Sequence, residues 1–246
     1  MVDTDSDTEL TLSAHALAAL QEFKQEEKQR QEEFQSLYTA ADEKFEKQNL
    51  KGMELFKEDW QLSQFWYSDE TADLLADALL EGADEETVVA IVSAPSVFAS
   101  IKKKDPATLP TKKIYLFEYD KRFEVLAGKD YFFYYDYFKP LDFNDKLKGK
   151  VHRLLIDPPF LTDDCQTKSS ITAKALLVSD KAQKTKTGAL KYRLVSCTGE
   201  RMKNVISRAY PDTHITTFHP EHANGLSNEF RCYASFEWAK WKFECD

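Results

Sequence analysis

The sequence lacks several features that would place a protein in a class at once. It has only seven glycines in 246 residues and no Gly-x-Gly turn, so the usual nucleotide-binding fingerprint is missing. No apolar run approaches the roughly 18 residues that a membrane-spanning helix needs. The first residues carry Asp and Glu where a secretory signal would carry Lys and an apolar run. These absences predict a cytoplasmic protein with no membrane association.

Paired cysteines and positive charge are also scarce. The four cysteines form no Cys-x-x-Cys pair, which predicts free thiols in a reducing compartment; they are Cys165, Cys197, Cys232 and Cys245. Lys and Arg number 33 against 42 Asp and Glu, and the net charge of −9 argues against a protein that grips a nucleic acid backbone. A basic protein partner suits this charge better, and we expect no direct nucleic acid binding.

The sequence also offers no convincing metal site. His219 and His222 stand three residues apart in an expected loop, but no third ligand lies near them in the sequence. We therefore expect surface histidines and no metal.

Composition divides the chain into three parts. Residues 1–11 are acidic and polar and predict a disordered tail. Residues 12–59 are rich in Ala, Glu, Gln and Lys with apolar residues at helical spacing, which predicts a helical extension. This extension could be a lid or a partner-docking arm, but simple packing on the main domain is the favoured interpretation. Residues 60–246 form the main domain, and we expect a monomer.

The main domain is organised around residues 150–160, KVHRLLIDPPF. Its apolar residues predict a strand buried on most of its surface, as in the middle of a parallel sheet. Pro158 and Pro159 end this strand in a stiff loop, because proline has a fixed φ and no N–H for the ladder. Ligands bind at this end of the strands in open α/β sheets.

The tetrapeptide Asp157-Pro158-Pro159-Phe160 could orient an amine. Asp157 and the Pro158 carbonyl offer acceptors, while Phe160 could lie against the group that carries the nitrogen. The alternative is a loop that merely ends a strand, and the tetrapeptide alone does not decide between them.

A helix follows the aromatic stretch that begins at Trp60. Ser68 or Asp69 is its expected N-cap. A ligand carboxylate could sit near Tyr67, Ser68 and Thr71, because a helix N-terminus attracts anions. Packing of these aromatic residues on the core is an equally good interpretation.

Three further segments predict strands whose ends could bind a nucleotide. The first, within residues 88–98, breaks at Ser93, Ala94, Pro95 and Ser96, where small residues would let backbone approach a ligand. The second, residues 113–120, ends with carboxylates where nucleotide folds bind a ribose diol; these are Glu118 and Asp120. The third, residues 130–137, brings Asp136 beside Tyr137 or Phe138, which would suit the edge and face of an adenine ring. A solvated carboxylate at a strand end is the alternative for Glu118.

The remaining segments complete a seven-stranded sheet. A helix is expected over residues 168–178, a basic loop over 181–191, a strand over 190–197 and a helix over 200–210. Strands over 214–218 and 229–238 are joined without a helix, so the last strand should run antiparallel. Strand and helix thus alternate five times before a terminal hairpin. The expected fold is a Rossmann-like, doubly wound seven-stranded sheet, mostly parallel with an antiparallel last strand.

Together these segments resemble the seven-stranded, S-adenosylmethionine-dependent methyltransferases. More closely, QFWYSDETA, VSAPSVF, FEYDKRF, DPPF, SCTG and NEFRCY resemble the elongation factor 1-alpha lysine methyltransferases, once described as N6-adenine DNA methyltransferases because of the tetrapeptide. The resemblance implies S-adenosyl-L-methionine as cofactor and elongation factor 1-alpha as protein substrate. It also implies positions for the cofactor: Tyr67, Ser68 and Thr71 near its methionine end, Ser93, Ala94, Pro95 and Ser96 at the turn that replaces the Gly-rich one, Glu118 on the ribose and Asp136 on adenine. Residues 157–160 would receive the amine.

Two other functions remain open from the sequence. An N6-adenine methyltransferase acting on DNA or RNA would carry the same tetrapeptide, although the net acidity and the lack of a basic second domain oppose it. A non-catalytic scaffold could use the N-terminal helix to bind a partner.

Overall fold

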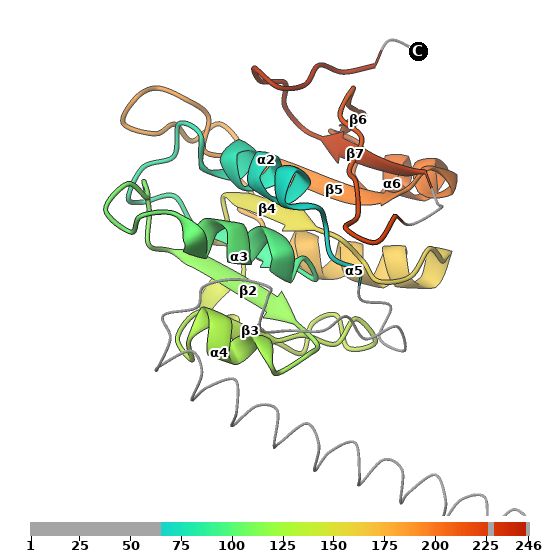
Figure 1. Ribbon diagram of the computed structural model, residues 1–246, viewed down its shortest axis with the longest axis horizontal. Helices are drawn as coiled ribbons and strands as arrows, with labels where there is room; N and C mark the ends of the chain where they lie inside the picture. Colours follow the sequence, from blue (N-terminus) through green and yellow to red (C-terminus); the bar gives the residue numbers. More distant parts are fainter. Residues whose placement is uncertain (1–64, 226–228, 245–246) are drawn as a thin grey trace, which may run out of the picture. The chain divides into compact units, whose positions relative to one another are not determined.

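The computed structural model describes residues 65–225 and 229–244 of the chain, so the expected acidic tail and helical extension lie outside the described residues. A seven-stranded sheet runs through this part of the chain (Figure 1). The strand order is β3-β2-β1-β4-β5-β7-β6. The strands are β1 (Val89–Val92), β2 (Ile114–Glu118), β3 (Phe132–Tyr134), β4 (Arg153–Ile156), β5 (Arg193–Gly199), β6 (His214–Ile215) and β7 (Phe230–Ala234).

The first five strands pair in parallel, and β7 pairs antiparallel with both β5 and β6. The predicted mostly parallel sheet with an antiparallel last strand is therefore confirmed. The terminal hairpin inserts β7 between β5 and β6. The strand that ends at Asp157 is central, as the sequence indicates, because β4 lies between β1 and β5.

Helices cover both faces of the sheet. The first face carries α2 (Asp69–Leu80), α3 (Pro95–Lys103) and α4 (Phe123–Ala127), and the second carries α5 (Asp163–Leu176) and α6 (Lys203–Ala209). Strand residues alternate between the two cores: Val89 and Ile91 of β1 pack with the first group, whereas Ala90 and Val92 pack with the second. Successive side chains of a strand point to opposite faces, so a strand buried on both sides is apolar throughout.

Local signals explain where the helices next to the strand ends begin. Ser68 caps α2 by accepting a hydrogen bond from the Thr71 N–H at 3.2 Å, as predicted. Thr162 caps α5 in the same way, because its side-chain oxygen accepts a hydrogen bond from the Cys165 N–H at 3.3 Å. The expectation that this helix begins at Lys168 was wrong, because Thr162 followed by two acidic residues is a good N-terminal signal.

Two connections also differ from the expected alternation. Between β3 and β4 the chain forms only a short 3-10 turn, η3 (Asp145–Leu147), so a helix does not follow every strand. The helix expected over residues 200–210 begins as a 3-10 turn, η4 (Glu200–Met202), before α6. Both differences leave the carboxyl ends of the strands aligned at one edge of the sheet, where the cavity described next lies.

Candidate active site

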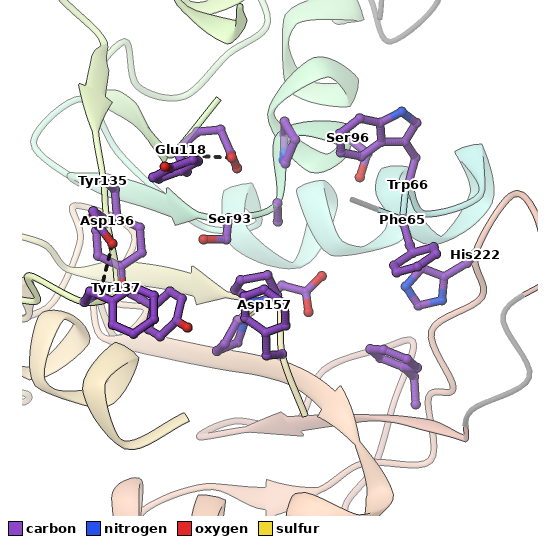
Figure 2. A pocket seen from close by; sticks show the side chains of 18 residues that line it. Phe65, Trp66, Ser93, Ser96, Glu118, Tyr135, Asp136, Tyr137, Asp157 and His222 are labelled. Atoms are coloured by element: carbon purple, nitrogen blue, oxygen red, sulfur yellow. Dashed lines mark hydrogen bonds between the residues drawn. The ribbon is translucent and has the colours of Figure 1, made fainter. Parts of the chain in front are cut away.

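A cavity of about 260 Å³ opens at the carboxyl ends of β1, β2 and β4 (Figure 2). The described residues that line it come from all parts of the domain; they are Phe65, Trp66, Ser93, Ala94, Pro95, Ser96, Glu118, Tyr119, Tyr135, Asp136, Tyr137, Phe138, Asp157, Pro158, Pro159, Phe160, His222 and Phe230. In Figure 2, Glu118 and Asp136 lie toward one end, Phe65 and His222 toward the other, and Asp157 between them. The cavity therefore has a carboxylate-rich end, an aromatic end and a carboxylate at its centre.

The turn after β1 brings backbone close to the cavity without glycine. Ser93 has a φ of 56°, in the left-handed region that non-glycine residues rarely adopt. Ala94 then caps α3 with no side-chain hydrogen bond, and Pro95 occupies the first turn. The first backbone N–H groups of α3 therefore have no side-chain cap, and such groups can serve a ligand at a helix start.

Glu118 ends β2 as a buried carboxyl. Its Oε1 accepts hydrogen bonds from the N–H groups of Tyr119 at 2.9 Å and Asp120 at 3.2 Å. Burial raises the pKa of Glu118 to about 8, although these two backbone donors oppose the rise. The backbone fixes one oxygen of the carboxyl, and Oε2 is left for a ligand in the cavity.

Asp136 and the aromatic residues beside it form the carboxylate-rich end of the cavity with Glu118. The Oδ1 of Asp136 accepts a hydrogen bond from the Phe138 N–H at 2.9 Å. The ring centroids of Tyr137 and Phe138 lie 4.2 Å apart, and those of Tyr137 and Phe160 lie 5.8 Å apart. Flat rings next to a fixed carboxylate give a slot that suits a heteroaromatic ring with polar edges.

Asp157 stands where β4 ends. Its backbone N–H donates to the Val92 carbonyl at 3.0 Å, which ties it to β1. The tetrapeptide loop after it is held in turn by Gln166, whose Nε2 donates to the carbonyl of Phe160 at 3.1 Å. Burial raises the pKa of Asp157 to about 7, against the effect of a hydrogen bond from Tyr67. Asp157 can therefore change protonation near neutral pH.

The segment 221–223, between β6 and β7, borders the aromatic end of the cavity. It is fixed to the segment before α2, because the Ser68 N–H donates to the Glu221 carbonyl and the Ala223 N–H donates to the Trp66 carbonyl, each at 2.9 Å. His222 packs on Phe230, with ring centroids 4.4 Å apart. His222 is half-buried and lines the cavity, whereas His219 is exposed as expected.

The structure does not bring every predicted site residue to the cavity wall. Ser93, Ala94, Pro95, Ser96, Glu118, Asp136, Tyr137 and residues 157–160 line it, whereas Tyr67, Ser68, Thr71 and Asp120 do not. The Thr71 hydroxyl accepts from the Glu221 N–H at 3.0 Å and so holds the β6–β7 loop. Asp120 forms an ion pair with Arg122 at 2.5 Å. Thr71 and Asp120 thus support the cavity wall from outside.

Several lining residues were not identified as site residues from the sequence. Phe65, Trp66, Tyr119, Tyr135, His222 and Phe230 reach the cavity through tertiary packing. The density of aromatic residues around Trp66 was a usable signal, but no local pattern connects it with His222.

The charge of the cavity is one-sided. The described lining includes the carboxyls of Glu118, Asp136 and Asp157 and contains no Lys or Arg. Across residues 65–225 and 229–244, no group of three or more His, Cys, Asp or Glu side chains could hold a metal ion. The cavity therefore suits an organic ligand that carries positive charge.

No helix in the described part of the chain is both long and apolar enough to cross a membrane.

The fold and the cavity at its strand ends define the class as a Rossmann-like α/β protein that binds an organic ligand at the carboxyl ends of its parallel strands. The profile of the family described as "Probable N6-adenine methyltransferase" matches residues 58–238. Saccharomyces cerevisiae "Protein-lysine N-methyltransferase EFM5" is 70% identical over 234 residues, covering 95% of this chain and 94% of the relative. Human "EEF1A lysine methyltransferase 1" is 37% identical over 238 residues, covering 96% and 97%. Dictyostelium discoideum "Protein-lysine N-methyltransferase DDB_G0272708" is 35% identical over 232 residues, covering 94% and 93%. The chain belongs to this family, whose relatives named here are protein-lysine methyltransferases.

Proposed function

We propose that the protein transfers methyl groups from S-adenosyl-L-methionine to a lysine side chain of translation elongation factor 1-alpha. The observation that carries this proposal is the half-buried Asp157 at the centre of a cavity that has carboxylates and aromatic rings but no Lys or Arg among its described lining residues. A lysine ammonium and a sulfonium are both cations, and this lining favours both. The names of the yeast and human relatives support the protein substrate.

The residues present fit the cofactor. The uncapped start of α3 offers backbone donors, Glu118 offers a fixed carboxyl for a ribose diol, and Asp136 with Tyr137 offers a slot for adenine. When bound, the cofactor supplies an activated methyl group on a positively charged sulfur. The functions of the surrounding residues are to bind it, to orient the amine and to exclude water.

Asp157 and Phe160 would act on the target amine. Lysine is protonated at neutral pH, with an ordinary pKa near ~10.4, and must lose a proton before its nitrogen can attack. An ionised Asp157 accepts a hydrogen bond from the ammonium and can accept its proton, because its own pKa is raised to about 7. The Phe160 ring lines the same cavity and can hold a methylated ammonium by cation–π attraction, which permits repeated methylation.

Adenine in DNA or RNA is the second candidate substrate, and the family description favours it. The net charge of −9 opposes it, because binding a duplex depends on neutralising phosphates with Lys and Arg.

The three described cysteines form no disulfide, which supports a location in a reducing compartment such as the cytoplasm.

The test is to incubate the protein with labelled S-adenosyl-L-methionine and, in parallel, purified elongation factor 1-alpha and a mixed DNA substrate. Asp157→Ala is the inactive control, and Asp163→Ala, at the exposed start of α5, is the matched control that should stay active. Label on the elongation factor that disappears in Asp157→Ala is the expected result. Label on DNA alone would support the adenine methyltransferase, and label on neither would support a non-catalytic scaffold.

A further inference from the structure

We propose that Tyr67 is a positioning residue for Asp157: its hydroxyl holds one oxygen of the carboxylate so that the other is presented to the target ammonium. The inference rests on the function proposed above and assigns it a further residue. Tyr67 lies just before α2, 90 residues from Asp157 in the sequence, and its hydroxyl donates to Asp157 Oδ2 at 2.5 Å.

The surroundings of Tyr67 hold its ring in one place. Tyr67 is 4% exposed, and its backbone forms an isolated antiparallel β-bridge with that of His222. The ring centroids of Tyr67 and His222 lie 4.9 Å apart. Tyr67 does not line the cavity, so it approaches Asp157 from behind the wall. A buried hydroxyl held in this way keeps its direction without loss of entropy when a substrate binds.

The orientation of the Asp157 carboxylate depends on its hydrogen bond with Tyr67. Among the described residues its carboxylate accepts a hydrogen bond only from Tyr67, through Oδ2, and Oδ1 accepts none. The backbone is fixed by the bond to Val92 and by the two prolines that follow, but those contacts do not set the side-chain torsion. Tyr67 therefore sets which oxygen faces the cavity.

The proposed methyl transfer to lysine needs no reactant besides the lysine side chain and the methyl donor. The lysine ammonium gives one proton to Asp157 Oδ1 or to water, the nitrogen lone pair forms the bond to the methyl carbon, and that carbon's bond to sulfur breaks with the electron pair going to sulfur. Tyr67 exchanges no proton, because its hydroxyl already donates to Oδ2. Burial and the nearby carboxylate raise the pKa of Tyr67, which keeps it a donor.

Other titratable groups face Asp157 from each element packed around it. Glu118 at the end of β2 and Cys197 on β5 both interact electrostatically with Asp157, and so does Cys165 on α5. His222 reaches the same side from the β6–β7 loop, against Tyr67. Burial raises the pKa values of Glu118 and Cys165, and a hydrogen bond with Cys232 together with burial raises that of Cys197. All three groups are neutral at pH 7, so the Tyr67 hydrogen bond is the contact that favours an ionised Asp157.

The test compares Tyr67→Phe with Tyr210→Phe in the full chain. Tyr210 is a buried tyrosine of the other core whose hydroxyl has no hydrogen-bond partner among the described residues, so its removal is a matched control. For Tyr67→Phe we expect kcat/KM on the elongation factor to fall on the order of 10- to 100-fold, the range for a lost hydrogen bond to a charged group. The acidic limb of the kcat/KM profile should move to higher pH, and the Kd for S-adenosylhomocysteine should change less than threefold. Tyr210→Phe should change none of these.

A mutant cycle separates positioning from a general loss of structure. In an Asp157→Asn background, Tyr67→Phe should add little further loss, because Tyr67 acts through the carboxylate. Equal losses in both backgrounds, or an unchanged pH profile, would overturn the proposal. If Tyr67→Phe does not fold, 3-fluorotyrosine at position 67 keeps the ring and makes the hydroxyl a stronger donor. That replacement should move the acidic limb to lower pH, and no movement would count against the proposal.

One readout does not depend on the substrate. NMR titration of a ¹³C-labelled Asp157 carboxyl should give a higher pKa in Tyr67→Phe than in the wild type. If the wild type methylates no protein but this difference is present, the proposed function fails while the positioning role of Tyr67 stands. If the difference is absent in an enzyme that does methylate lysine, the positioning role fails.

Discussion

The pH dependence of adenosine binding tests the role proposed for Glu118. The pKa of this buried carboxyl is raised to about 8, and only its ionised form leaves Oε2 free to accept hydrogen bonds from both ribose hydroxyls. Binding of the diol at neutral pH therefore requires loss of a proton. The apparent Kd is the intrinsic Kd multiplied by 1 + 10^(pKa − pH), so adenosine should bind roughly tenfold more weakly at pH 7 than at pH 9.

Calorimetric titration of adenosine across this pH range measures the effect directly. Adenosine is the right probe because it carries the ribose and the base but no group of its own that titrates near neutral pH. Glu118→Gln should bind adenosine more weakly and with little pH dependence, because its amide cannot ionise. In wild-type protein, 2′-deoxyadenosine should also show a weaker pH dependence, because it lacks one hydroxyl of the diol. A wild-type Kd that stays constant over this range, or a slope that persists in Glu118→Gln, would refute the assignment.

Three further changes test other parts of the structure. Arg153 is fully buried and donates to the carbonyls of Leu79 and Glu81, each at 2.7 Å. Arg153→Met should lower the free energy of unfolding in urea by roughly 3 kcal/mol, and a loss well under 1 kcal/mol would contradict this. Thr162→Ala removes the cap of α5 and should cost about 1 kcal/mol in the same assay, whereas Thr162→Ser should cost almost nothing. Phe160→Ala should shift the product toward monomethyl-lysine in mass spectra, because the cation–π surface is lost; an unchanged product distribution would exclude that role.

Glu118 also links stability to pH. Its pKa is raised above the ordinary value, so the native state holds this proton more tightly than the unfolded state does. Stability should therefore fall as the pH rises from the ordinary pKa of a glutamate toward about 8. Glu118→Gln should remove this part of the decline, giving a higher Tm than wild type at pH 9 in calorimetric scans. A Tm difference that is the same at pH 5 and pH 9 would contradict the linkage.

The parts of the site that follow from local sequence could be predicted. The buried run before Asp157 and the two prolines after it fix a central strand and its end, and Ser68 precedes an apolar-faced helix. Glu118 was predicted because ribose-binding carboxylates recur at the end of the second strand. Each of these inferences uses residues that are adjacent in the chain, where the covalent structure limits the possible arrangements.

The remaining parts depend on contacts that a single sequence does not encode locally. Nothing near His222 indicates that it will pair with Tyr67, because the loop that carries it is polar and could equally face solvent. The hydrogen bond from Tyr67 to Asp157 joins two segments on different elements. Its existence depends on how α2 packs on β4, and the apolar spacing of α2 gives a buried face but no register. The start of α5 at Asp163 could have been found from Thr162, since the signal was present.

The anchoring of the β6–β7 loop has a consequence for the order in which this protein becomes functional. The Glu221 N–H donates to the hydroxyl of Thr71 across 150 residues of sequence, so the aromatic wall with His222 forms only after the last hairpin has docked. During synthesis the Glu118 and Asp157 strands emerge long before that hairpin. A nascent chain that ends before Glu221 would have the sheet centre but a cavity open on one side. The residues proposed for adenosine, Glu118 and Asp136, are therefore made first, and the aromatic end of the cavity is completed last.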